Sequence, residues 1–364
     1  MKIVLVCTNA AVVKTFRMEL IDKLLRNGHS VSVIANFDGE DWHLVGVKTI
    51  NISMQNRSKN PFQSLNYYKQ VKKAVAEEKP DIVMTFMIKP NTFGVLAVSK
   101  CPGVRIYSMV EGMGVVYTDD SIVYKILRII TDLLYKKAMK RIDGLFCLNK
   151  YDAAYFTDKK YIEAEKVHVL SGIGLDLKKF EFSPVCNFKK FVIIARLLKE
   201  KGIEEFCKAA EIIKNKYPEA EFCIYGSKVD NTQKIINEYE RKKVIEYRGT
   251  TNNVPEVLKE STALVLPTYR EGSSRIIMEA MSVGRPVIAS NTIGCNHLVD
   301  VGKNGILTPI KDVQAIADAI EFLIQNPDKV VEYGRNSRKK AENEFDSEVV
   351  NSKILEIIEK GVQK

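Results

Sequence analysis

Two glutamates that stand eight positions apart are the side chains whose chemistry is easiest to infer. Glu271 and Glu279 belong to the stretch 264–286, which reads L-V-L-P-T-Y-R-E-G-S-S-R-I-I-M-E-A-M-S-V-G-R-P. Its apolar start predicts a buried strand, its polar middle a loop, and its apolar residues at spacings of three and four a helix. Carboxylates bind hydroxyl groups, and the amides of a helix N-terminus bind phosphate. The stretch therefore suits an anionic ligand that carries hydroxyls.

A second pair of candidate residues is basic. Arg196 and Lys201 occur in I-A-R-L-L-K-E-K-G-I, between an expected strand at 191–195 and an expected helix at 203–215. Arginine offers a planar fork of donors and lysine a compact charge, a combination that suits a diphosphate.

The elements that would position these residues alternate between strand and helix along the chain. The opening has an expected strand at 1–8, a turn at Asn9–Ala11, a helix at 16–25 and a strand at 31–35. This is a dinucleotide-type β-α-β unit, but the G-x-G-x-x-G fingerprint is missing. A turn-rich stretch near 171–176 separates two such series. We predict an α/β chain with doubly wound parallel-sheet domains at 1–183 and 184–345, and a helix at 346–364 that packs back on the first domain.

Composition limits the classes of function. The chain has 364 residues, of which 46% are apolar and 27% charged, which indicates two globular domains. The longest apolar runs are shorter than the ~20 residues of a membrane span, and the start resembles a strand more than a signal peptide. Seven cysteines without C-x-x-C spacing suggest reduced, buried thiols in the cytosol. No D-x-D, H-E-x-x-H or Cys/His cluster occurs, so neither a metal nor another cofactor is implied.

The charge is concentrated in the first half. Residues 1–183 contain 27 Lys/Arg and 19 Asp/Glu, a net charge of +8, whereas residues 184–364 contain 28 and 26, a net charge of +2. This excess of positive charge predicts that the first domain binds an anionic partner. The segment 121–141 is an amphipathic basic helix, which is either a core-facing helix with a solvated face or a helix that lies on an anionic membrane surface.

Three motifs together resemble retaining glycosyltransferases of family 4, which have the GT-B fold of two Rossmann-like domains facing across a cleft. They are the E-x(7)-E motif of Glu271 and Glu279, the R-x(4)-K signature of Arg196 and Lys201, and N-G-I-L-T-P at 304–309. Their order and spacing also fit, so the resemblance covers nearly the whole chain.

The resemblance implies roles in a donor site for a nucleotide sugar. Arg196 and Lys201 would hold the donor diphosphate as it leaves, Glu271 would contact the sugar, and Glu279 would bind the ribose hydroxyls. The remaining donor-binding residues lie in three expected loops; they are Gly272, Ser273 and Ser274, Gly226, and Thr250 and Val254. An ordinary turn is the alternative interpretation for the last two loops.

The first domain matches the family less closely. The glycine-bearing loop usual after the first strand is replaced by Asn9-Ala10-Ala11, and the frequent histidine after a middle strand by Ile88 or Lys89. The four histidines, at 29, 43, 168 and 297, are expected to be structural or on the surface. The likeness to a bacterial subgroup that builds capsule, O-antigen or lipid-linked oligosaccharides implies cleft residues near acceptor or donor phosphates, with structural roles as the alternative; these residues are Asn9, Arg17, Lys89, Asn91 and Glu111.

The resulting hypothesis is a retaining, metal-independent glycosyltransferase. It would move a hexose or N-acetylhexosamine from a UDP-sugar to a polyprenyl-diphosphate-linked glycan at the inner face of the bacterial plasma membrane, as a peripheral cytoplasmic protein. A GT-B-like UDP-sugar epimerase or hydrolase is the nearest alternative. An NAD-type oxidoreductase is disfavoured by the missing glycine fingerprint, and a nucleic-acid-binding protein by basic helices without interleaved aromatic residues.

Overall fold

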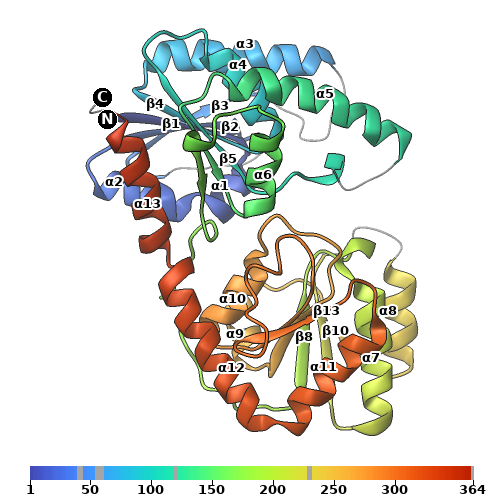
Figure 1. Cartoon of the computed structure of the whole chain (residues 1–364). Helices are drawn as coiled ribbons and strands as arrows, with labels where there is room; N and C mark the ends of the chain where they lie inside the picture. The colour runs from blue at the N-terminus through green and yellow to red at the C-terminus, as the bar shows by residue number, and fades with distance from the viewer. Residues whose placement is uncertain (39–43, 54–60, 118–120, 228–231, 362–364) are drawn as a thin grey trace. The chain divides into compact units, whose positions relative to one another are not determined.

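The computed structural model describes residues 1–38, 44–53, 61–117, 121–227 and 232–361. The chain forms two compact units (Figure 1): unit 1 comprises Met1–Gly174 and Ser347–Lys364, and unit 2 comprises Leu175–Asp346. This division precedes the 183/184 boundary expected from the sequence, because Leu175, Leu177 and Phe180 are buried in the core of unit 2.

Unit 1 is built on a seven-stranded parallel sheet with the order β3-β2-β1-β4-β5-β6-β7. The strands are β1 (Lys2–Asn9), β2 (Ser30–Asn36), β3 (Val47–Asn51), β4 (Ile82–Phe86), β5 (Arg105–Val110), β6 (Gly144–Cys147) and β7 (Val167–Val169). The helices are α1 (Ala10–Phe16), α2 (Met18–Arg26), α3 (Pro61–Glu78), α4 (Val95–Val98), α5 (Ile122–Met139), α6 (Lys150–Asp158) and α13 (Ser347–Lys360), with short η1 (Pro90–Gly94), η2 (Val115–Tyr117) and η3 (Ala164–Lys166).

Helices cover both faces of this sheet. The side chains of β1 alternate between two hydrophobic clusters, as a strand buried on both faces requires. One cluster is closed by α3, α4, α5 and α6, and the other by α1, α2 and α13. Helix α13 lies beside α2 (Figure 1), where Lys23 and Arg26 form ion pairs with Glu348.

The start of unit 1 differs from the turn expected at Asn9–Ala11. Helix α1 begins at Ala10, directly after β1, because the Asn9 side chain caps it by accepting a hydrogen bond of 2.9 Å from the Val12 amide. Arg17 then separates α1 from α2, since its backbone (φ −122°) leaves the helical region.

Unit 2 repeats the plan on a six-stranded parallel sheet with the order β10-β9-β8-β11-β12-β13. The strands are β8 (Lys190–Ile194), β9 (Glu221–Tyr225), β10 (Glu246–Tyr247), β11 (Ala263–Leu266), β12 (Val287–Ser290) and β13 (Gly305–Thr308). The helices are α7 (Ile203–Lys216), α8 (Thr232–Arg241), α9 (Val254–Lys259), α10 (Arg275–Val283), α11 (Val313–Gln325) and α12 (Pro327–Lys340), with short η4 (Lys199–Lys201) and η5 (Ala341–Phe345).

Candidate active site

The candidate donor residues follow the central strands of unit 2. Strand β8 lies between β9 and β11, so the chain turns to opposite sides of the sheet after these strands. In doubly wound sheets the crevice at such a switch point, at the carboxyl ends of the strands, is where ligands bind. Arg196 and Lys201 follow β8, and Glu271 follows β11, so both expected motifs lie at this edge.

Two loops are fastened together there. The carbonyl of Glu200 accepts hydrogen bonds from the Tyr269 amide (2.8 Å) and the Thr268 hydroxyl (3.1 Å). Gly202 has a φ of +73°, and a Cβ atom at this position would lie 2.1 Å from the Pro267 carbonyl oxygen. Only glycine lets the two backbones approach so closely.

This contact brings Lys201 to Glu271. The Lys201 Nζ atom lies 2.5 Å from Glu271 Oε1, and the two side chains are only 15% and 18% exposed. A third loop, after β12, supports the glutamate: the Glu271 amide donates to the Ile293 carbonyl (3.0 Å), and a Cβ atom on Gly294 would lie 2.3 Å from the Glu271 carbonyl oxygen. A partly buried cation and carboxylate are thus held by three loops. Arg196, at the same edge, is exposed.

Helix α10 holds the second glutamate of the motif. Glu279 is 8% exposed and accepts a hydrogen bond from Arg275 Nε (2.8 Å), one turn earlier on the helix. The buried Ser274 occupies the N-cap position, and its amide donates to the Gly294 carbonyl (2.9 Å). The Ser274 amide is thus bonded within the protein. The hydroxyl of the preceding residue, Ser273, lies 3.3 Å from His297 Nε2.

The loops after β9 and β10 reach the same edge. The Gly226 amide donates to the Gly249 carbonyl (2.8 Å), and its carbonyl accepts from the Tyr247 hydroxyl (2.9 Å). Thr250 is exposed in the loop after β10, and Val254 is the first residue of α9. These bonds fasten the two loops to each other, but within the described residues no backbone hydrogen bond joins Thr250 or Val254 to Glu271.

Three residues beside the site were not anticipated. Tyr269 donates to Glu205 Oε1 (2.7 Å), and burial and then this bond raise the pKa of its hydroxyl. Cys295 is fully buried, and burial and then the charge of Glu271 raise the pKa of its thiol well above the usual value. His297 contacts Ser273, although the sequence suggested only a structural or surface histidine. The signal for Cys295 is its place directly after Gly294, in the loop that follows β12. His43 lies outside the described residues.

The switch point of unit 1, where β1 lies between β2 and β4, gathers most of the residues expected in the first domain. Arg17 is 1% exposed, forms an ion pair with Glu111, and places its guanidinium 4.0 Å from the centre of the Phe86 ring. A buried arginine held by a carboxylate and an aromatic ring is fixed in orientation. Asn9 caps α1 at this edge.

Asn91 is a structural link in the same region. Its side chain is 1% exposed, accepts from the Thr85 hydroxyl (2.8 Å) and donates to the Met109 carbonyl (2.7 Å). Its amide is thus used within the protein. Lys89, by contrast, is half-buried, and burial lowers the pKa of its ammonium group. Met87 precedes it with a φ of +75°, an unusual conformation for a residue other than glycine and one that clusters at functional sites.

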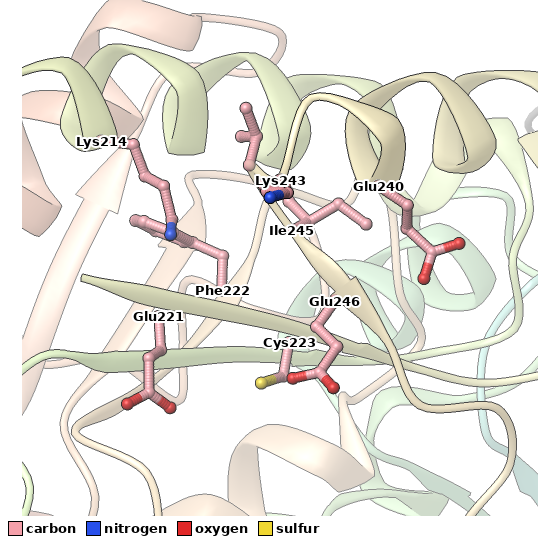
Figure 2. A pocket seen from close by; sticks show the side chains of 9 residues that line it. Lys214, Glu221, Phe222, Cys223, Glu240, Lys243, Ile245 and Glu246 are labelled. Carbon is pink, nitrogen blue, oxygen red and sulfur yellow. The ribbon is translucent and has the colours of Figure 1, made fainter. Parts of the chain in front are cut away.

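A separate pocket of about 350 Å³ opens at the other edge of the unit 2 sheet (Figure 2). Glu221 and Glu246, the first residues of β9 and β10, line it together with Lys243. It therefore lies at the amino ends of the strands, away from Lys201 and Glu271. Among the described residues no group of three or more His, Cys, Asp or Glu could hold a metal ion. None of the described helices combines the length and apolar composition needed to cross a bilayer.

Comparisons with known proteins follow the same division of the chain. The family model described as Glycosyltransferase Family 4 matches residues 13–173, and the one described as Glycosyl transferases group 1 matches residues 177–340. The chain is 25% identical over 364 residues to the N,N'-diacetylbacillosaminyl-diphospho-undecaprenol alpha-1,3-N-acetylgalactosaminyltransferase of Campylobacter jejuni, covering 96% of each chain.

Two further likenesses concern sequence and fold. The chain is 30% identical over 301 residues to the UDP-Gal:alpha-D-GlcNAc-diphosphoundecaprenol alpha-1,3-galactosyltransferase of Escherichia coli, covering 77% of this chain and 74% of that one. Among solved structures, Anabaena HepE in complex with UDP superposes with a TM-score of 0.79 at 19% identity, covering 99% of this chain and 100% of that one. This last likeness concerns the fold alone.

Proposed function

This chain belongs to the family 4 glycosyltransferases of the GT-B fold, and from that premise we propose that it moves a sugar from a UDP-sugar to a hydroxyl of a polyprenyl-diphosphate-linked glycan. The matches to the family models confirm the family that the sequence predicts, and the two parallel-sheet units confirm the predicted fold class. The observation that carries the proposal is the Lys201–Glu271 pair at the switch point of unit 2.

The donor is a UDP-linked hexose or N-acetylhexosamine in unit 2. The name of the E. coli relative contains UDP-Gal, and the likeness to HepE is to a complex with UDP. Lys201 and Arg196 bind the diphosphate, since both are cations at the end of β8. Glu271 accepts hydrogen bonds from the sugar and Glu279 from the ribose, with the 272–274 loop between them. Gly226 lies near the phosphates and the 250–254 segment near the base.

The acceptor is a glycan on a polyprenyl diphosphate, as the names of the two bacterial relatives suggest. Unit 1 offers the charge that such a ligand needs. Arg17, held by Glu111, and the half-buried Lys89 are cations at the carboxyl edge of its sheet. Asn9 caps α1 at this edge, and Asn91 links the ends of β4 and β5 through Thr85 and Met109.

The reaction breaks the bond between the anomeric carbon and the UDP oxygen and forms a bond from the same carbon to the acceptor oxygen. The acceptor oxygen attacks the anomeric carbon from the face that the diphosphate leaves, so the configuration is retained. The acceptor proton passes to the leaving diphosphate, so no protein base is needed. Lys201 stabilises the charge that grows on the leaving group, an interaction stronger in the transition state than in the ground state. Glu271 stabilises positive charge on the sugar. No metal is required, because Lys201 and Arg196 stabilise the negative charge on the leaving diphosphate.

Helix α5 supports a further part of the proposal, contact with an anionic membrane at the cytoplasmic face. Its outward face carries six aliphatic side chains that are each 49–76% exposed: Ile122, Val123, Ile126, Ile129, Ile130 and Leu133. Asp132 fastens the helix to the unit by accepting from the hydroxyls of Tyr117 (2.8 Å) and Tyr155 (2.7 Å). A fixed apolar stripe beside basic residues suits a lipid surface that holds the acceptor.

A UDP-release assay with and without acceptor tests the proposal. The purified protein is incubated with UDP-, GDP- and ADP-sugars, and then with the same donors plus a polyprenyl-diphosphate glycan in detergent. We expect UDP release only from a UDP-sugar and only when acceptor is present. Free sugar or an epimer formed without acceptor would favour a hydrolase or epimerase instead.

A further inference from the structure

A second pocket, of about 420 Å³, lies at the C-terminal end of α5 in unit 1. It is lined by Lys140, which follows α5, by Lys160 beyond the end of α6, and by Lys166 before β7. Met139 and Ile162 give it an apolar floor, since they are 1% and 8% exposed. The pocket is therefore a small basic depression with buried apolar walls.

The charges of this pocket are not balanced internally. Glu163 lines it too and pairs with Lys166 (3.2 Å). Neither Lys140 nor Lys160 has a carboxylate within ion-pair distance in the part of the chain that the structure describes. Two lysines without an ion-pair partner among the described residues thus line a cavity that has room for an anion such as a phosphate group.

The backbone at Lys160 is one that favours glycine. Its φ is +52°, and the turn that ends α6 is closed by hydrogen bonds from the Lys160 amide to Thr157 (2.9 Å) and from the Tyr161 amide to Phe156 (2.9 Å). Glycine is the usual residue at this place after a helix. A lysine thus stands where the backbone alone would favour a residue without a side chain.

The pocket of Figure 2 offers a comparison within the same chain. There Lys243 has a φ of +57° just after α8. The turn is closed by the same two bonds: the Lys243 amide donates to the Glu240 carbonyl (2.9 Å), and the Val244 amide donates to the Tyr239 carbonyl (3.0 Å). Two lysines line that pocket, but so do three glutamates: Glu221, Glu240 and Glu246. Of these two pockets, the one in unit 1 has the excess of positive charge.

The pocket is continuous with the exposed stripe of α5. Lys140 stands eighteen residues after Ile122, which is five helical turns, so both lie on the same face of the helix. Ile126, Ile129 and Leu133 lie along the same line, and Lys136 and Lys137 continue it toward the pocket. An apolar stripe that ends in lysines matches the depth profile of a lipid monolayer, with acyl chains inside and phosphates at the rim.

We propose that the Lys140–Lys160 pocket binds the phosphate of an anionic phospholipid and so fixes the orientation of α5 on the bilayer. The inference rests on the membrane contact of the proposed function and adds to it a specific headgroup site. A diffuse contact would treat all exposed lysines of the helix alike, whereas a pocket makes Lys140 and Lys160 contribute more than their charge.

Vesicle flotation of the full chain tests this difference. Vesicles of phosphatidylcholine with and without phosphatidylglycerol are compared for the double variant Lys140→Ala with Lys160→Gly. Lys136→Ala with Lys137→Ala is the control, since it removes the same charge from exposed sites outside the pocket. Each lysine near an anionic surface contributes about fivefold to binding. We expect the pocket variant to lose ~tenfold more binding to phosphatidylglycerol vesicles than the control, and equal losses would overturn the proposal.

Two further measurements separate the explanations. Thermal melting of Lys160→Gly and Lys243→Gly checks folding, and both should melt at or above the wild-type temperature because glycine suits these backbones. Inorganic phosphate, titrated by calorimetry, should bind weakly to the wild type and not to the pocket variant. If phosphate binds in this way while the two double variants lose vesicle binding equally, the site takes free phosphate and the lipid assignment is wrong.

The stripe itself is tested by Ile126→Asn with Ile129→Asn. Loss of vesicle binding in this variant, without loss in the pocket variant, would refute the pocket and leave the membrane contact standing. The reverse result would refute the stripe and leave the pocket standing. Sugar transfer to an acceptor in detergent should be unchanged in the pocket variant, so failure of the headgroup site and failure of the transferase proposal are distinguishable.

Discussion

At the scale of single residues, the proposed chemistry rests on the partly buried ion pair of Lys201 and Glu271. The sequence predicted a role for each side chain separately, because each stands in a recognisable motif. Their contact across seventy positions was not predictable, since it depends on Gly202 packing on Pro267 and on Gly294 packing on Glu271. The roles of the donor-site residues remain predictions, and variants of Lys201 and Glu279 test two of them.

Replacing Lys201 with alanine should lower kcat by about 10²–10³-fold, the usual effect of removing one charge-stabilising group from a transition state. The donor KM should change much less, because the interaction is strongest with the leaving diphosphate. Lys199→Ala, two positions earlier in the same short helix, is the matched control. Steady-state kinetics with saturating acceptor measure both constants, and a Lys201 variant with full turnover would refute the assignment.

Replacing Glu279 with glutamine should raise the donor KM by about 10–100-fold, because a charged hydrogen bond contributes about 1.5–3 kcal/mol. The substitution keeps the size of this buried side chain, so the helix should stay folded. Titration of UDP by calorimetry gives the affinity directly. An affinity equal to that of the wild type would exclude contact between Glu279 and the nucleotide.

His297 shows where residue-level inference stopped. A histidine outside any recognisable motif is usually structural, and nothing in the immediate sequence of His297 indicated otherwise. The loop after β12 brings it to Ser273, and that loop is positioned by backbone bonds from Glu271 and Ser274. Such contacts depend on tertiary packing and have no local pattern.

At the scale of elements, strong periodicity was predictive and weak periodicity was not. Helix α10 and strand β11 follow the apolar pattern that forecast them. Strand β3, with the pattern V-K-T-I-N, is half-exposed, so its apolar residues do not form a run. Helix α1 was taken for a turn because its capping residue, Asn9, directly ends a strand. For α5 the sequence showed an amphipathic helix, but which apolar residues face outward required the structure.

Glu78 joins several elements of unit 1 and yields a prediction about acid stability. Burial raises the pKa of its carboxyl, but bonds from Lys48, from Lys2 (3.0 Å) and from Ser32 (3.0 Å) outweigh burial, so the net pKa is lowered. A lowered folded-state pKa contributes stability that is complete above the unfolded value and lost as the pH falls through the folded value.

Glu78→Gln should therefore lower the free energy of unfolding by about 1–3 kcal/mol at neutral pH. The difference from the wild type should shrink below pH 4.5, the ordinary value for this carboxyl. Urea unfolding at several pH values measures this difference. Glu77→Gln is the control, because Glu77 is exposed and pairs only with the exposed Lys73 on the same helix among the ion pairs described. A difference that stays constant down to low pH would mean that the carboxylate charge does not stabilise the fold.

At the scale of the whole molecule, the alternation of strands and helices was sufficient to predict two doubly wound units, and the motifs were sufficient to predict the family. The exact division was harder, because Leu175–Phe180 looks like a linker in sequence but packs into the core of unit 2. The two units share one plan, but the residues at the carboxyl edges of their sheets differ: an ion pair of Lys201 and Glu271 in unit 2, and one of Arg17 and Glu111 in unit 1. We therefore expect the two edges to bind different ligands.

The central claim is that the carboxyl edge of the unit 2 sheet, and not the pocket of Figure 2, binds the UDP part of the donor. Amide hydrogen exchange of the full chain with and without UDP tests it most directly, since bound loops open less often. We predict added protection in residues 196–202, 267–274 and 291–297, and less of it in Glu279→Gln. Protection confined to residues 240–246, around Lys243, or no protection anywhere, would contradict the account.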